Sequence, residues 1–198
     1  VSTDENALCF CSAIQPAHHM EAIAGYLSRS GLSWPAGEIG RVQSAGEDWP
    51  DAYRYTPMRP EEAEACIVTW WHPSWNCVVV QRYHGLLFGL PNAVTSFNRW
   101  SKLAEAISRR LLIVLLSMYF DDADMQDWSR QSQDTQSCIG SLMSLLGSPW
   151  AAEKSQPSND QGDFLGLIHD LSEIQVSTLR FWPRPALVDK VTNIIKLA

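Results

Sequence analysis

The sequence lacks the patterns that mark a membrane protein. Its longest apolar run lies within residues 111–120, whereas a helix that spans a bilayer needs about 20 apolar residues. No basic-then-apolar signal segment opens it. We therefore expect no membrane partner. The chain begins with Val1 rather than Met, so we also expect it to be a piece of a longer polypeptide.

Zinc-type spacing of cysteine and histidine is also missing. The 5 cysteines are scattered, and although Cys9 and Cys11 lie one residue apart, no second pair follows at a zinc-like distance. The 5 histidines show no metal pattern either. An odd number of scattered cysteines favours buried, reduced thiols in an intracellular protein of the cytoplasm or nucleus.

Positive charge is scarce. The chain has 15 Lys and Arg against 22 Asp and Glu, which gives a net charge of -7. Affinity for nucleic-acid phosphates comes from Lys and Arg, so this balance has the wrong sign for a nucleic-acid binder. Any polymerase or nuclease interpretation must place its positive surface elsewhere.

The most informative stretch present is the apolar run at 111–120, which ends in Asp121 and Asp122. An unbroken run of branched apolar residues suits a strand buried on both faces. Two adjacent carboxylates at its end repel each other, and each raises the pKa of the other. Solvent, a base or a divalent cation relieves such a pair, so the stretch alone leaves an acidic turn and a metal site both open.

Helical and strand patterns interleave along the rest of the chain. At 198 residues and 45% hydrophobic, the chain can form one large domain, or a domain plus a fragment. Because hairpins alternate with helices, the order predicts an α+β fold, an antiparallel sheet with helices packed on one face. The expected elements are helices at 14–32, from about 92, at 129–148 and from 189, and strands at 66–71, 76–83, 111–120, 164–168 and 176–181.

Five motifs in one order resemble the palm motifs of reverse transcriptases. The wording Asp-Trp-Pro-Asp-Ala-Tyr-Arg-Tyr-Thr-Pro-Met of 48–58 looks most like retrotransposon enzymes of the tyrosine-recombinase (DIRS-type) class. Tyr-x-Asp-Asp alone is a weak signal, whereas five motifs at suitable separations are a strong one. The motifs are 48–53, 88–97 (beginning Phe-Gly), 119–122 (Tyr-Phe-Asp-Asp), 153–155 (Glu-Lys-Ser) and 164–166 (Phe-Leu-Gly).

The resemblance implies how the chain is divided. Residues 41–185 would form the palm, with a ferredoxin-like or RRM-like core. Residues 1–40 would be an N-terminal segment with part of the fingers, and 186–198 the truncated start of a thumb or connection. The basic strand of the fingers would precede Val1, and the thumb and any RNase H segment would follow Ala198. Those parts would supply the missing positive surface.

The implied activity is that of an RNA-directed DNA polymerase, which joins a dNTP to a primer 3′-OH with two magnesium ions, or with manganese instead. Magnesium prefers hard oxygen ligands, and carboxylates from neighbouring strands supply them. The resemblance makes Asp48 and Asp121 the metal-bridging pair and makes Asp122 support the site, so all three are candidate catalytic and metal residues.

Other roles toward the nucleotide also follow from the resemblance. Tyr53 would place its ring against the sugar and exclude a 2′-OH, which selects deoxynucleotides. Phe88 and Gly89 would touch the incoming nucleotide, where glycine permits a close backbone approach. Lys154 would meet the triphosphate or donate a proton to pyrophosphate.

Further positions would contact the primer and its RNA or DNA template. Phe97 lies on the helix that the family uses against the template, and Tyr119 precedes the carboxylates. The run Phe164, Leu165 and Gly166 resembles the hairpin that grips the primer end.

One departure from the family keeps other functions open. The stretch 123–127 (Ala-Asp-Met-Gln-Asp) is acidic and polar where the family resumes an apolar strand, so we expect the chain to depart here from a working enzyme. A catalytically inactive retroelement remnant or a palm-like binding module is one alternative. A metal-dependent nuclease is another, which explains the aspartates but neither Tyr53 nor 164–166.

Overall fold

The computed structural model describes residues 10–87, 89–90 and 92–197. These residues form two units. One contains Asp51–Trp100, and the other contains Cys9–Pro50 together with Ser101–Ala198. The assignment of residues 1–40, 41–185 and 186–198 to fingers, palm and thumb stays a prediction.

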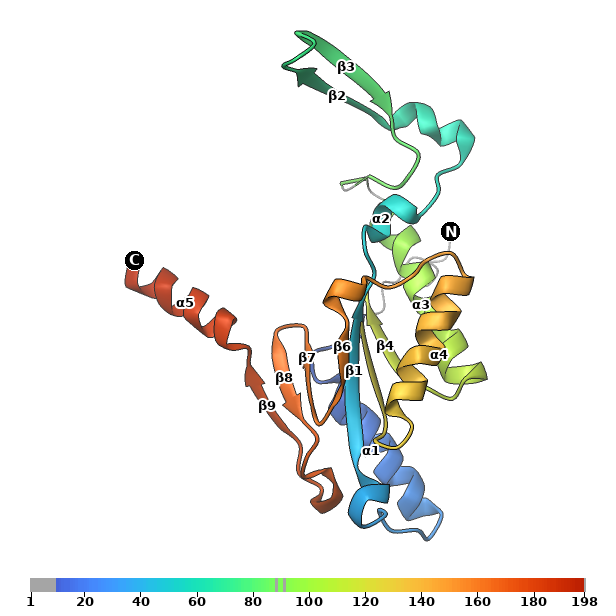
Figure 1. Cartoon of the computed structure of the whole chain (residues 1–198), viewed down its shortest axis with the longest axis vertical. Coiled ribbons are helices and arrows are strands. Elements are labelled where there is room, and N and C mark those ends of the chain that lie inside the picture. The colour runs from blue at the N-terminus through green and yellow to red at the C-terminus, as the bar shows by residue number, and fades with distance from the viewer. Residues whose placement is uncertain (1–9, 88, 91, 198) are drawn as a thin grey trace. The chain divides into compact units, whose positions relative to one another are not determined.

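A four-stranded antiparallel sheet forms the centre of the larger unit (Figure 1). Its strand order is β4-β5-β1-β6, and along the chain its elements follow the strand–helix–strand–strand–helix–strand order of a ferredoxin-like core. The predicted α+β class with an antiparallel sheet is therefore confirmed. The elements are β1 (Val42–Asp48), α3 (Ala93–Leu111, of which the part from Ser101 onward belongs to this unit), β4 (Leu115–Tyr119), β5 (Asp122–Trp128), α4 (Ser132–Leu145) and β6 (Gln156–Asn159).

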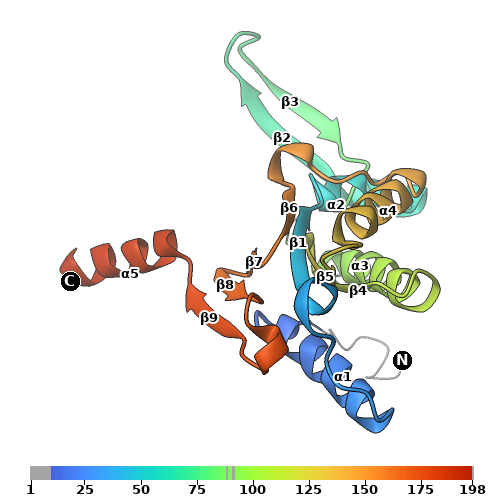
Figure 2. The same cartoon turned by 60° about the horizontal axis from the view of Figure 1, so that its bottom comes forward.

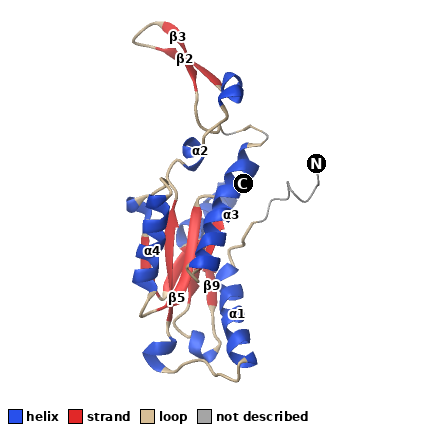
Figure 3. Cartoon of the chain, turned by 90° about the vertical axis from the view of Figure 1, so that its right-hand side faces the viewer, coloured by secondary structure: helices blue, strands red, loops and turns tan. Residues whose placement is uncertain are grey.

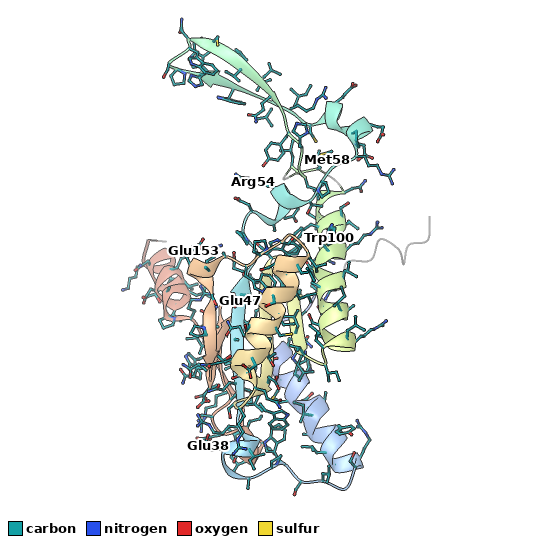
Figure 4. The ribbon with its side chains drawn as sticks, turned by 45° about the vertical axis from the view of Figure 1, so that its right-hand side comes forward. Glu38, Glu47, Arg54, Met58, Trp100 and Glu153 are labelled. Carbon is teal, nitrogen blue, oxygen red and sulfur yellow. The ribbon has the colours of Figure 1, made fainter. Side chains whose placement is uncertain are left out.

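One face of this sheet is covered by α4, whose Ile139 and Met143 are buried. Polar side chains of the helix also bond to this face. The Gln136 amide donates to Glu47 on β1 at 2.6 Å, and Thr135 donates to Asp127 on β5. Glu47 lies on β1 beside α4 (Figure 4). Apolar contacts and side-chain hydrogen bonds together hold the helix against the sheet.

The opposite face is covered by a three-stranded sheet and by α1 (Gln15–Arg29) (Figure 2). The three strands are β7 (Gln161–Phe164), β8 (Leu167–Asp170) and β9 (Arg180–Pro183). His19 on α1 bonds to Gln126 on β5, and His169 on β8 is fully buried next to Asp124 on β5. Side chains of α1 and of the three-stranded sheet therefore pack against β5 on this face.

The polar stretch 123–127 lies in β5, the second arm of the hairpin, so it does not disrupt the hairpin, a point that the sequence alone leaves open. β5 pairs along its length with β1 and for most of it with β4. Asp124 is buried, and its carboxylate accepts hydrogen bonds from Ser44 at 2.7 Å and Gln126 at 2.6 Å. Burial of a polar group is tolerated when its hydrogen bonds are made, and here they are made within the sheet.

The apolar run at 111–120 is only partly a strand, which corrects the predicted bounds. Leu111 ends α3, and β4 begins at Leu115. Ile113, between them, is 87% exposed with a φ of 57°. The helix extends to this point because the Val114 and Leu112 amides still donate to the Ser108 carbonyl, and Arg109 donates to the Leu116 carbonyl at 2.7 Å.

The C-terminal strands also differ from the prediction. The expected strand 164–168 is interrupted at Leu165 and Gly166, whose φ values of 51° and 82° make the turn between β7 and β8. β9 pairs with β8, as expected for a later strand. The last helix begins at Pro185 rather than 189 and is α5 (Pro185–Leu197). Short 3-10 turns occur at Gly37–Gly40, Pro60–Ala65, Ala152–Lys154 and Ile174–Val176.

Among the four cysteines that the structure describes, only Cys66 has the expected buried thiol. Cys11 is half-buried, and Cys77 and Cys138 are exposed. All four are free thiols, and Cys9 lies outside the described residues.

The smaller unit contains the hairpin predicted at 66–83, which is confirmed. It consists of β2 (Ile67–His72) and β3 (Cys77–Arg82), preceded by the short helix α2 (Ala52–Tyr55) and followed by the start of α3 (Figure 3). One face of the hairpin is apolar and open to solvent. Its exposed members are Ile67, Trp71, Val78 and Val80.

Candidate functional site

Three aspartates lie at one end of the central sheet. Asp48 is the last residue of β1 and stands directly opposite Asp122, the first residue of β5. Residues paired in this way project to the same face of a sheet. Asp121 lies in the tight turn that joins β4 to β5, where the preceding Phe120 has a φ of 52°.

Main-chain hydrogen bonds fix both carboxylate-bearing segments. The Trp49 amide donates to the Asp121 carbonyl at 2.9 Å, and the Ala151 amide donates to the Asp48 carbonyl at 2.9 Å. Buried Leu116 and Met118 hold β4 in the core. The aspartates therefore extend from a rigid edge of the core.

These carboxylates are electrostatically unfavourable as a group. Partial burial, followed by the charges of Asp121 and Asp48, raises the pKa of Asp122 to about 6. The pKa of Asp121 is also raised, first by burial and then by Asp48. The nearby positive groups thus do not fully offset burial and the mutual repulsion of these carboxylates.

Lys154 supplies part of the missing positive charge. Its Nζ lies 2.7 Å from the Asp48 Oδ1, and this hydrogen bond raises the pKa of the lysine. The lysine ends the 3-10 turn Ala152–Lys154, which follows α4. A cation bound to these carboxylates would take over the role that the ammonium group has here.

The donor chemistry fits magnesium, although the arrangement is not a finished metal site. Asp48, Asp121 and Asp122 offer hard oxygens from two neighbouring strands and their turn. Within residues 10–87, 89–90 and 92–197, no three Asp, Glu, His or Cys side chains are grouped closely enough to hold an ion. A divalent cation would therefore have to displace Lys154 from Asp48 and draw the carboxylates together.

A cavity of about 210 Å³ opens beside the aspartates. Asp48, Asp122 and Lys154 line it, together with Phe164 and Leu165 from the β7–β8 turn. Gly166 completes the turn. The structure thus brings the residues expected to grip the primer next to those expected to hold the metal.

Sequence reasoning missed other polar residues of this cavity. Glu47, Gln156, Asp163 and Arg184 also line it. The available signal for Arg184 was its place between Pro183 and Pro185, because two prolines hold a backbone in a restricted conformation. Asp163 directly precedes the Phe-Leu-Gly motif.

The other residues that are predicted to contact the nucleotide belong to the smaller unit. Tyr53, on α2, stacks on Phe97 of α3 with ring centroids 4.9 Å apart and an interplanar angle of 25°. Gly89 is exposed with a φ of 91°, and Phe88 lies outside the described residues. Their roles toward the nucleotide and template stay predictions.

Tyr119 belongs to the larger unit, as the last residue of β4. Its ring centroid lies 5.5 Å from that of Phe10 and 5.1 Å from that of Phe120. The ring is half-buried in this aromatic group, and its predicted role toward primer or template is untested.

Comparison with known proteins identifies the fold. No family model matches the sequence, and no curated protein matches it significantly. Solved structures do match. The chain is similar to the foamy viral protease–reverse transcriptase in complex with an RNA/DNA hybrid, with a TM-score of 0.57 and 15% identity over 77% of this chain and 18% of that one.

Telomerases are similar as well. Telomerase from Candida albicans, in complex with a TWJ fragment of telomeric RNA, matches with a TM-score of 0.61 and 12% identity over 92% of this chain and 36% of that one. Apo telomerase from Candida tropicalis matches with a TM-score of 0.57 and 12% identity over 85% and 40%. The chain thus spans between 18% and 40% of these proteins. It has the polymerase-like fold found in reverse transcriptases and telomerases.

Among the helices that the structure describes, none combines the length and the apolar character needed to cross a bilayer.

Proposed function

We propose that the chain is the palm-centred part of a retroelement reverse transcriptase, an RNA-directed DNA polymerase that transfers a nucleotide from a dNTP to a primer 3′-OH. The observation that carries this proposal is the register of Asp48 opposite Asp122, with Asp121 in the adjoining turn. This arrangement lies at the ends of two inner strands of a polymerase-like fold.

Asp48 and Asp121 would hold the metal ions, and Asp122 would support them. Two magnesium ions, or manganese, would supply activation of the hydroxyl and charge neutralisation of the triphosphate. Burial raises the pKa values of Asp121 and Asp122 most, and repulsion between the carboxylates adds to the rise. A divalent cation would relieve that repulsion, which favours this role. Lys154, once released from Asp48, would be free to face the triphosphate.

The substrate would be a primer on an RNA or DNA template, with a dNTP as the second reactant. The turn Phe164 to Gly166 would seat the primer end beside the carboxylates, and Tyr53 would select the deoxyribose. The missing fingers, thumb and possible RNase H segments of the same polyprotein would supply positive surface that the net charge of -7 does not.

The test is primer extension on an RNA template with magnesium or manganese. It compares this chain, and the longest polypeptide that contains it, with their Asp121→Asn variants. We expect weak or no extension by the chain alone and clear extension by the longer polypeptide. Asp121→Asn should lower that extension on the order of 100-fold or more, because one metal ligand is lost. Asp134→Asn, on the exposed side of α4, is the matched control and should leave it unchanged.

Other outcomes would select the alternatives. Equal extension by the longer polypeptide and its Asp121→Asn variant would contradict the assigned role. Binding of the duplex without extension would identify a binding module or an inactive remnant. This is the second candidate function, because a metal ion could bind Asp48 only after displacing Lys154 from it. Metal-dependent degradation of the duplex without dNTP would identify a nuclease.

A further inference from the structure

Arg184 is bonded to the β7–β8 turn, which lines the cavity beside the aspartates. Its guanidinium Nε lies 2.7 Å from the Asp163 Oδ2, and its Nη2 donates to the Asp163 Oδ1 at 3.0 Å. Its backbone amide also donates to the Gly166 carbonyl at 2.9 Å. Arg184 is therefore fixed through both its side chain and its main chain on either side of Phe164 and Leu165.

Asp163 is itself held against the central sheet. The Gln156 side chain on β6 accepts from the Asp163 amide at 3.2 Å and donates to the Asp163 carbonyl at 3.3 Å. Gly46 on β1 makes room for this glutamine, since a Cβ at Gly46 would lie 2.9 Å from the Gln156 Cδ. The guanidinium is thus positioned relative to the strand that bears Asp48.

The guanidinium still has donors to offer. Arginine carries five N–H groups, and Asp163 uses one edge of the planar fork. The Arg184 side chain is 49% exposed and lines the same cavity as Asp48 and Asp122. Its charge acts on Asp122, where it opposes the rise in that carboxyl's pKa. A half-exposed guanidinium held by a carboxylate is well suited to two-pronged binding of phosphate.

We propose that Arg184 is a further substrate-binding residue of this site, whose remaining donors bind a backbone phosphate of the nucleic-acid strand that rests on the β7–β8 turn. Asp163 is its positioning residue. This inference rests on the proposed function. The other source of the same chemistry is the triphosphate of the free nucleotide, so the experiment has one arm for each.

The first arm measures binding of a labelled DNA primer on an RNA template by fluorescence anisotropy over a range of salt concentrations. Arg184→Gln should weaken binding about 10-fold and reduce the slope of log K against log salt by about one, as expected for one lost phosphate contact. Arg180→Gln is the matched control, because Arg180 on β9 pairs with exposed Glu173 and does not line the cavity. It should weaken binding less than about 2-fold, consistent with loss of a distant charge.

Two further variants separate binding from structure. Asp163→Asn leaves the arginine charge in place, so it should weaken binding less than Arg184→Gln and leave the salt slope unchanged. Arg184→Lys keeps the charge but not the fork, so it should keep the slope and lose part of the affinity. Thermal unfolding of each variant shows whether the fold persists, and the salt slope would not change if Arg184 only stabilised the turn.

The second arm measures binding of dATP to the same variants. Loss of dATP binding by Arg184→Gln with unchanged duplex binding would overturn the assignment to the strand. Equal effects of Arg184→Gln and Arg180→Gln, or of Arg184→Gln and Asp163→Asn, would overturn Arg184 as a phosphate ligand while the polymerase proposal stands. Both arms use the longest polypeptide that contains this chain, because the net charge of -7 disfavours binding of nucleic acid by the chain alone. If that unmodified polypeptide bound no duplex at all, the inference would fall together with the substrate assignment on which it rests.

Discussion

Two hairpins of this chain reverse what their sequences suggest. β2–β3 is built from valine, isoleucine and tryptophan, yet Ile67, Trp71, Val78 and Val80 are each more than half exposed. The second arm of the β4–β5 hairpin contains Asp, Gln and Asp, yet its residues 123–126 are buried. The apolar hairpin lies in the smaller unit and the polar strand in the middle of the central sheet.

The difference teaches that partners rather than composition decide burial. The side chains of Asp124, Gln126 and Asp127 on β5 each have a hydrogen-bond partner on a neighbouring element, which lowers the cost of burying them. β-Branched residues favour the strands of a two-stranded hairpin, but the hairpin alone has no second layer to cover its apolar face. The comparison can be tested by substitutions in the two hairpins and the elements that cover them.

The largest effect is expected at Asp124. Asp124→Ala would leave the Ser44 hydroxyl and the Gln126 amide without their buried acceptor, so it should lower the free energy of unfolding by about 3 kcal/mol. Urea unfolding measures this, with exposed Asp134→Ala as the control at below about 1 kcal/mol. A loss at Asp124 no larger than that of the control would mean that β5 is not held by its polar bonds.

Gly162 tests how tightly the three-stranded sheet packs on β5 and β1. A Cβ there would lie 2.5 Å from the His169 Nε2 and 2.8 Å from the Ser44 Oγ, so Gly162→Ala should destabilise the chain by about 2 kcal/mol. Gly140→Ala, within α4, is the control, since a Cβ there would lie 3.8 Å from the Trp150 ring, an ordinary contact distance. It should be neutral or should stabilise the helix by up to about 1 kcal/mol. Equal stability of the two variants would exclude close packing at Gly162.

Asp122→Asn should increase stability while it impairs the proposed chemistry. The folded chain holds the Asp122 proton up to a pKa of about 6, above the ordinary value of about 4, so ionisation opposes folding. Stability should therefore fall as pH rises from about 4 to about 6. After allowance for solvent screening, the variant should gain about 1 kcal/mol at pH 7 and little at pH 4. Urea unfolding at both pH values measures this, and exposed Asp189→Asn should show no such gain.

The smallest effect is expected in the apolar hairpin. Val80 is 64% exposed, so Val80→Thr should change the free energy of unfolding by less than about 0.5 kcal/mol. The same substitution at Val42, which is 1% exposed on β1, buries a hydroxyl and should cost about 1–3 kcal/mol. A comparable cost at both positions would show that the open face of β2–β3 is covered in solution.

The sequence predicts most elements of the fold because their patterns are local. The hairpin at 66–83 and the helix from about 92 follow from alternation and from helical spacing. The strand at 111–120 was overextended because an apolar run contains no signal that divides helix α3 from β4. The division depends on Arg109 reaching the Leu116 carbonyl, a contact that periodicity does not encode.

The candidate site was predictable where a motif carried it. Asp48, Asp121 and Lys154 come from three separate motifs and lie near the same strand ends in the larger unit, whereas their roles stay predictions. Arg184 and Asp163 were missed because each is an ordinary charged residue until the β7–β8 turn brings them together. The sequence left the structure of residues 123–127 open for a similar reason, since Ser44, which bonds to Asp124, lies 80 residues before it.

The buried bonds of β5 also constrain how this chain can change over generations. Ser44, Asp124 and Gln126 satisfy one another, with His19 bonded to Gln126 from α1. A substitution at one of them leaves the others without a buried hydrogen-bond partner. The three residues should therefore be substituted together among relatives. A gene copy that decays without selection would break such a matched set early.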